Sequence, residues 1–133
     1  KADGKSRGKV GLSPQRAKSI AGSYDAKNKV LTIAQFSLPE GAEEYVNSAW
    51  EIQDNPFKGD AVNAYNDGPL EDGSIMGPFY EIESSSPAAN LSPGESLTHV
   101  HRTFHFTGTF EDLNAISKKI LGVDLATTST VFD

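Results

Sequence analysis

The sequence of 133 residues has no cysteine, one tryptophan, one methionine and no long hydrophobic run. Without cysteine, disulfide scaffolds and zinc or iron–sulfur sites with thiolate ligands are excluded. No stretch approaches the roughly 18 consecutive apolar residues of a membrane-spanning helix. We therefore expect a small folded domain with a modest core and no membrane partner.

Positive charge is scarce beyond the first 29 residues, which hold eight of the 12 basic residues and only two of the 18 acidic ones. Residues 1–16 are rich in Gly, Lys and Ser, carry no nucleic-acid-binding motif and lack the aromatic residues that such sites interleave with basic ones. We interpret residues 1–16 as a flexible basic lead-in with no nucleic-acid partner. Residues 17–133 are predicted to form a single β-domain.

Alternation of apolar and polar residues predicts a mainly β chain with antiparallel pairing. Strands are expected at residues 19–24, 30–38, 45–53, 61–65, 79–84 and 97–107, the first two joined as a hairpin. One C-terminal helix is expected over residues 110–121, because Thr109 and Asp112 form a capping pair and Gly122 is a good stop. In the 45–53 segment, Trp50, with Val46 and Ile52, is expected in the core.

Acidic and imidazole side chains gather on two successive predicted strands. Residues two apart on a strand share a face. The strand at 79–84 therefore presents Phe79, Glu81 and Glu83 on one side. The strand at 97–107 presents all three histidines of the chain on one side: His99, His101 and His105. If the two strands pair, two carboxylates face the imidazoles.

Three roles remain open for such a face. It can run acid–base chemistry or bind a sugar, with Asn63, Tyr65 and Asp67 of the preceding strand contacting hydroxyl groups. It can bind a divalent cation, the one cofactor that these residues suggest, through Glu81, Glu83, His99 and His101. It can also be an ion-paired surface of a non-catalytic interaction module.

A longer stretch resembles a known family. The run from Gly77 to Phe106, GPFYEIESSSPAANLSPGESLTHVHRTFHF, looks like the C-terminal end of the galactose mutarotase-like superfamily, and is closest to an uncharacterised bacterial branch of it. There a strand of the type G-F-x-L-E-x-Q carries the catalytic glutamate and an L-x-P-G-E turn follows, here Leu91–Glu95. The segment 62–68 resembles the preceding F-Y-T-G-N strand. The resemblance covers about residues 60–121.

The resemblance implies a large antiparallel β-sandwich (a supersandwich) of which this chain is the C-terminal half. A missing N-terminal half or a homo-oligomer partner would then cover its open face. Carbohydrate is the implied ligand, and periplasmic or secreted residence is the implied location. Glu81 occupies the place of the general base. The imidazole acid that the family carries further upstream is absent here, lies in a missing N-terminal part, or is replaced by His99 or His101. Glu83 stands where the family has glutamine, so one carboxyl of the pair should have a raised pKa unless a cation is near.

Overall fold

A computed structural model describes residues 1–49 and 51–131 of the chain. It confirms a mainly β chain with a helical C-terminal end. Its elements are β1 (Gly8–Leu12), β2 (Ile20–Asp25), β3 (Val30–Phe36), β4 (Val62–Asn66), β5 (Tyr80–Ser84), β6 (His101–Thr107), α1 (Phe110–Ile120) and α2 (Leu125–Thr130). Neither helix is long and apolar enough to cross a membrane, a finding that applies to the described residues.

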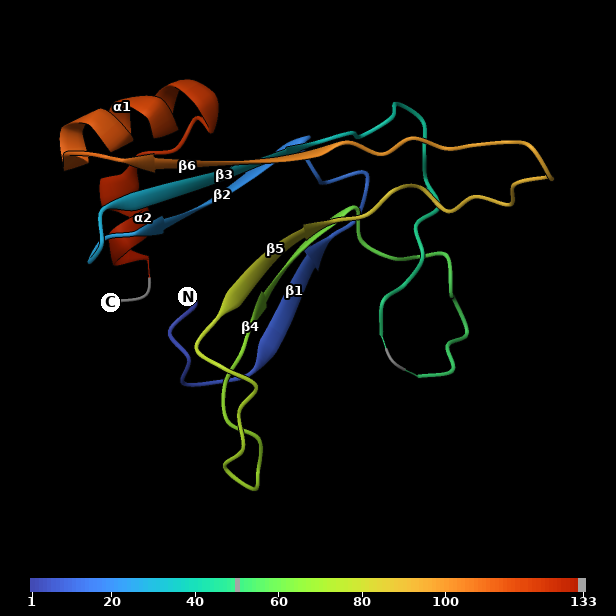
Figure 1. Cartoon of the computed structure of the whole chain (residues 1–133), viewed down its shortest axis with the longest axis horizontal. Coiled ribbons are helices and arrows are strands. Elements are labelled where there is room, and N and C mark those ends of the chain that lie inside the picture. The colour runs from blue at the N-terminus through green and yellow to red at the C-terminus, as the bar shows by residue number, and fades with distance from the viewer. Residues whose placement is uncertain (50, 132–133) are drawn as a thin grey trace. The chain divides into compact units, whose positions relative to one another are not determined.

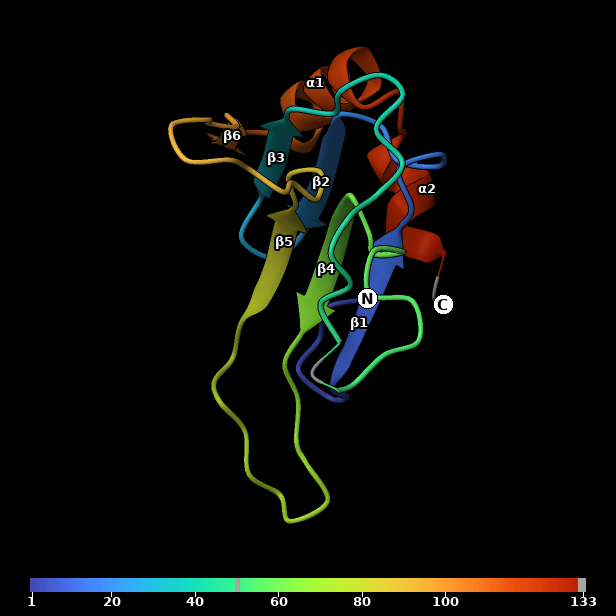
Figure 2. The same cartoon turned by 90° about the vertical axis from the view of Figure 1, so that its right-hand side faces the viewer.

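The chain divides into two compact units. The first, residues 1–19 and 36–100, contains a three-stranded sheet in the order β1-β4-β5. Both pairings in this sheet are antiparallel. Figure 2 shows the three strands side by side with β4 in the middle, and the long β4–β5 loop running well beyond the end of the sheet. This sheet carries the candidate site.

The second unit, residues 20–35 and 101–133, contains a sheet in the order β2-β3-β6 together with both helices, all labelled in Figure 1. β2 and β3 form the predicted antiparallel hairpin. The core of the unit joins alternate residues of β3 to one residue of each helix: Leu31, Ile33, Leu113 and Leu125. Burying such aliphatic side chains supplies the main stabilising term of a small unit.

Helix α1 lies where the sequence predicts it. Thr109 Oγ1 accepts a hydrogen bond from the Asp112 backbone N–H at 3.2 Å and donates one to Asp112 Oδ2 at 2.7 Å. Acidic residues in its first turn and basic residues in its last complement the helix dipole. Its apolar side packs on the core through Leu113, while Ile120 stays about half exposed.

The secondary structure differs from what the sequence indicates in three segments. The lead-in contains β1, whose Gly8-Lys-Val-Gly-Leu12 sequence has little strand propensity and is held by pairing with β4. The segment 45–53 is not a strand but contributes a single bridge between Tyr45 and Lys58. Its expected core residues Val46 and Ile52 are exposed, and Trp50 lies outside the described residues. The segment after Asp124, which has no marked pattern, forms α2.

The predicted strand at 97–107 is divided. β6 begins only at His101, and it lies beside β3 rather than beside β5. The preceding residue Val100 exchanges hydrogen bonds with Ser37 in the first unit, at 2.9 and 3.0 Å. A single alternating sequence pattern therefore serves two different units, and pattern alone does not reveal the break.

Candidate functional site

One face of the β1-β4-β5 sheet is polar, and the strand register defines which side chains share it. In one row Lys9 of β1, Tyr65 of β4 and Glu81 of β5 lie opposite one another. In the next row the three are Gly11, Asn63 and Glu83. Directly opposed residues of antiparallel strands project to the same side. We call this set the polar face: Lys9, Gly11, Asn63, Tyr65, Glu81 and Glu83.

Glu81 and Glu83 form a hydrogen-bonded carboxyl pair at the edge of the sheet. The hydrogen bond with Glu83, followed by partial burial and repulsion from Glu83, raises the pKa of Glu81. Burial acts to raise the pKa of Glu83 too, but hydrogen bonds with Lys9, Glu81 and Asn63 outweigh it, and the pKa lies below its usual value. The pKa values of the two carboxyls are thus shifted in opposite directions, as expected for two like-charged groups in close contact.

A lysine accounts for part of the difference between the pKa values of the two carboxyls. Lys9 Nζ lies 3.0 Å from Glu83 Oε2, with both side chains about two-fifths exposed. The sequence predicts that a second carboxyl beside Glu81 must either raise one pKa or recruit a cation. In the structure the pKa of Glu81 is raised, and an ammonium group lies beside Glu83.

Asn63 is nearly fully buried at the centre of the polar face. Its side-chain amide acts to lower the pKa of the Glu83 carboxyl. Its Oδ1 atom is buried and has no hydrogen-bond partner. Burying an unpaired acceptor costs free energy, so Asn63 is held at this position by the packing around it and not by a full set of hydrogen bonds.

The open space over Gly11 is used by a neighbouring side chain. A Cβ atom at this position would collide with the carboxyl group of Asp60, which lies directly over the glycine. By contrast, a Cβ atom at Gly8 of the same strand would meet nothing within 4 Å. Gly11 is therefore required by local packing.

A second hydrogen-bonded group adjoins the polar face. Arg7 Nε donates to the Tyr65 hydroxyl at 2.7 Å, and that hydroxyl donates to Asp67 Oδ1 at 2.6 Å. The other carboxylate oxygen of Asp67 accepts the backbone N–H groups of Met76 and Gly77, both at 2.9 Å. The hydrogen bond from Tyr65, then those from Gly77 and Met76, lower the pKa of Asp67.

Asp67 therefore anchors the long β4–β5 loop to the sheet, and its acceptor oxygens are all in use. The aromatic rings of Tyr65 and Phe79, whose centroids are 6.0 Å apart, form an apolar wall beside it. Phe79 is more than one-third exposed. An exposed aromatic face next to carboxyl and amide groups is the combination that sugar rings contact in proteins, through C–H surfaces and hydroxyl groups respectively.

The histidines do not join the carboxyl pair in the way the sequence suggests. β5 pairs with β4, and β6 with β3, so the predicted pairing between the Glu81 strand and the His101 strand is wrong. The groups that act on the two carboxyls are Lys9, Asn63 and Asp67, with no imidazole among them.

Each histidine instead has its own local partner. His99 Nε2 lies 2.8 Å from Ser84 Oγ, and Ser84 alternates with Glu83 and so projects to the other side of β5. His101 Nε2 lies 3.2 Å from Thr103 Oγ1, and His105 Nδ1 lies 3.0 Å from Thr32 Oγ1. The roles predicted for the three histidines are therefore not supported by their contacts.

The alternative metal site is not formed. Among residues 1–49 and 51–131, no group of three or more His, Cys, Asp or Glu side chains is arranged to hold a metal ion. The cation near Glu83 is the ammonium group of Lys9.

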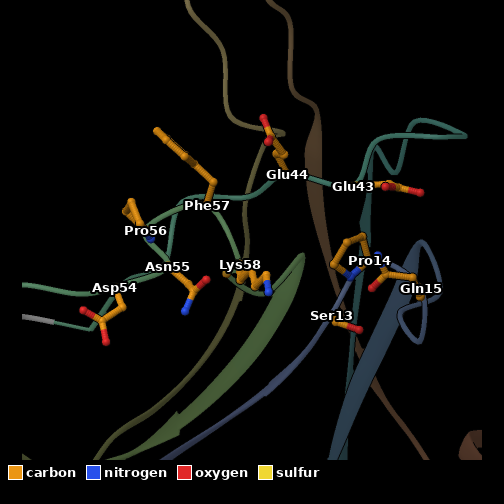
Figure 3. Close-up of a pocket in the computed structure, with 11 residues that line it drawn as sticks. Ser13, Pro14, Gln15, Glu43, Glu44, Asp54, Asn55, Pro56, Phe57 and Lys58 are labelled. Carbon is orange, nitrogen blue, oxygen red and sulfur yellow. The ribbon is translucent and has the colours of Figure 1, made fainter.

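A separate hollow of about 620 Å³ lies in the same unit, outside the polar face. It is drawn in Figure 3 and is lined by residues 13–15, 43–44 and 54–59, with the Lys58 side chain extending toward Pro14. Three of its lining side chains are acidic, Glu43, Glu44 and Asp54, and all three are exposed. The hollow contains none of the residues that the sequence marks as candidates.

Two residues that contact the candidate site escape the sequence analysis: Arg7 and Lys9. Both fall in the segment interpreted as a lead-in, where their basic character suggests only a solvated tail. The sequence signal that points to them is charge balance. The chain beyond the basic segment is acidic, and two neighbouring glutamates on one strand face need a compensating cation.

The fold and the polar face together define a mainly β protein with a lysine-compensated carboxyl pair on one sheet. A family model matches residues 1–132, and the chain belongs to that family, a family of unknown function called DUF6786. No curated protein and no solved structure matches the chain. The functional argument therefore depends on the geometry of the site.

Proposed function

We propose that the protein binds a carbohydrate on the polar face and performs acid–base chemistry on a sugar hemiacetal or glycosidic oxygen. The observation that carries the proposal is the carboxyl pair, in which the pKa of Glu81 is raised and that of Glu83 is lowered. Opening a hemiacetal needs one group to remove a proton and another to deliver one, each with a pKa suited to the working pH. Two neighbouring carboxyls whose pKa values are shifted in opposite directions supply both groups within one site.

In this proposal Glu83 is the base and Glu81 is the proton donor. This differs from the assignment that the family resemblance implies, in which Glu81 is the base and a histidine is the acid. The partners of the two carboxyls support the exchange of roles, because Lys9 and Asn63 both favour the charged form of Glu83. Phe79 and Tyr65 offer an aromatic surface to the sugar ring.

The architecture belongs to the proposal as well. We infer that the two sheets are parts of a galactose mutarotase-like β-sandwich, on the strength of the L-x-P-G-E turn and the strand that bears Glu81. The resemblance also favours residence outside the cytoplasm. Neither inference is needed for the chemistry at the carboxyl pair, which depends on the first sheet alone.

Calorimetric titration with neutral monosaccharides tests the binding, and polarimetry of a freshly dissolved α-hexose tests the chemistry. We expect Glu83→Gln to abolish rate enhancement and Glu81→Gln to reduce it at least about tenfold, a usual size for loss of acid–base catalysis. Glu40→Gln, which alters an exposed carboxyl in the 39–41 turn, is the matched control. Binding without rate enhancement would leave a lectin-like function, and no binding by any neutral sugar would reject the proposal.

A second candidate function is a non-catalytic interaction module. The face of the β1-β4-β5 sheet opposite the polar face is partly open and carries exposed apolar side chains: Val10 is 69% exposed and Tyr80 is 42% exposed, whereas Val62 is buried. Such an open sheet face is typical of a surface that a partner covers, either an N-terminal half or a second copy of the chain. Light scattering of the wild type and Val10→Asp tests the second copy, because the substitution should dissociate any dimer formed through this face.

A further inference from the structure

We propose that Lys9 is a positioning residue of the acid–base pair: its ammonium group holds Glu83 as a carboxylate and leaves Glu81 as the member that carries the proton. The part that Lys9 plays in acid–base chemistry rests on the proposed function. The proton arrangement itself is a property of the ligand-free protein and is tested without a sugar.

The strand register shows that Lys9 contacts Glu83 and not the glutamate of its own row. Lys9 lies in the same row as Tyr65 and Glu81, yet its ammonium group contacts Glu83 in the neighbouring row, at 3.0 Å. In its own row the Tyr65 side chain stands between Lys9 and Glu81, with its hydroxyl bound to Arg7 and Asp67. The neighbouring row has the short Asn63 amide on β4, and the long lysine side chain extends diagonally across it to Glu83.

Asp67 and Asn63 favour this distribution of the proton between Glu81 and Glu83, whereas Lys9 also acts to lower the pKa of Glu81, and the negative charge of Asp60 lies near the row of Glu83. On the β1 side, Arg7 is engaged with Tyr65 and lies 3.6 Å from Asp67 Oδ1, so its charge compensates that carboxylate. On β4, Asp67 acts to raise the pKa of Glu81, while the Asn63 amide stabilises the charged form of Glu83. Asp60 lies over Gly11 and adds negative charge to that end of the face. Lys9 is thus the one cation, among the described residues of the face, that contacts the pair.

The assignment has a consequence for the ligand. Lys9 is engaged by Glu83, and Arg7 by Tyr65 and Asp67, so both cations already have partners within the protein. The site is therefore matched to uncharged hydroxyl groups, with Glu81 donating a hydrogen bond and Glu83 accepting one.

Carbon-13 NMR of glutamate side chains, recorded from pH 3 to 8 on the full chain, tests the proposal. In the wild type we expect Glu83 to titrate at lower pH than Glu81. In Lys9→Met the Glu83 midpoint should rise by roughly 0.5 to 1 pH unit, because a half-exposed ion pair is lost. Lys9→Arg should restore the wild-type order, and Lys5→Met, which alters an exposed lysine of the same segment, should change nothing.

An unchanged Glu83 midpoint in folded Lys9→Met protein would overturn the proposal. If that variant does not fold, Glu83→Gln provides the decision: removal of the proton-sharing partner should lower the Glu81 midpoint, and an unchanged midpoint would overturn the assignment. A titration of the expected form in a protein that binds no sugar would reject the proposed function while leaving the role of Lys9 intact.

Discussion

The two sheets of this protein are stabilised by different means. The β2-β3-β6 sheet packs Leu31 and Ile33 against two amphipathic helices, so its unit depends on buried aliphatic contacts. The β1-β4-β5 sheet has a buried amide, Asn63, on its polar face and a fully buried carboxylate, Asp67, beside that face, which accepts hydrogen bonds from Tyr65, Met76 and Gly77. Buried polar groups persist when they are paired, and they then fix one geometry rather than add large stability.

The aliphatic core and the polar face therefore have different structural roles. An aliphatic core tolerates small rearrangements and supplies cohesion, whereas a hydrogen-bonded polar face loses its geometry if a single partner changes. A site that must hold two carboxyls in different protonation states belongs on the second kind of surface. Substitutions should accordingly have large effects on stability in the aliphatic core and specific effects on geometry at the polar face.

The largest expected loss of stability is in the aliphatic core. Leu113→Ala removes a side chain that is 1% exposed and should lower the free energy of unfolding by about 2–5 kcal/mol. Ile120→Ala, on the exposed side of the same helix, should cost less than about 1 kcal/mol. Urea denaturation followed by circular dichroism measures both, and equal losses would contradict the assignment of the core.

A smaller loss is expected at the polar face itself. Gly11→Ala places a methyl group against the Asp60 carboxyl, and we expect a loss of about 1–3 kcal/mol from the forced displacement. Gly8→Ala is the matched control on the same strand, because its added methyl group meets open space. Thermal denaturation of the two variants should separate them clearly, and a neutral Gly11→Ala would mean that Asp60 does not occupy this position.

The N-cap of α1 should contribute less again. Thr109→Ala removes the acceptor of the Asp112 backbone N–H and should cost about 1 kcal/mol. Thr109→Ser keeps the hydroxyl and should stay close to the wild type in the same denaturation experiment. A loss of equal size in both variants would show that the methyl group matters and the cap does not.

The most specific effect, and the one that depends on pH, concerns Asp67. Its pKa lies below the usual value, so it stabilises the fold above the pKa of the unfolded chain, and this contribution disappears as pH falls through the lower folded value. Asp67→Asn should therefore be less stable than the wild type at pH 7 and converge with it in acid. Hydrogen exchange should also be faster at the Met76 and Gly77 amides of the variant, and equal exchange would contradict the anchoring role.

Sequence patterns predict those parts of this protein that are set by local rules. The hairpin of β2 and β3 follows from alternation around an Asp–Asn turn, and α1 follows from its caps and apolar spacing. Period-two alternation also places Glu81 with Glu83, and Asn63 with Tyr65, on shared strand faces, and the register then joins these pairs.

Partners distant along the chain are not predictable in this way. β1 carries two glycines and a lysine, so only its pairing with β4 makes it a strand, and the sequence gives no reason to place Lys9 beside Glu83. The break before His101 is likewise invisible, because one alternating pattern continues across it. Strand order depends on long-range contacts, and this is why the histidines are predicted beside the wrong strand.

The most direct test of the central claim is a backbone amide NMR titration of the whole chain with neutral hexoses. The account predicts chemical-shift changes at Lys9, Asn63, Tyr65, Glu81 and Glu83, and their loss in Glu83→Gln. Shift changes confined to the hollow around residues 43–44 and 54–59, or none at all, would contradict it.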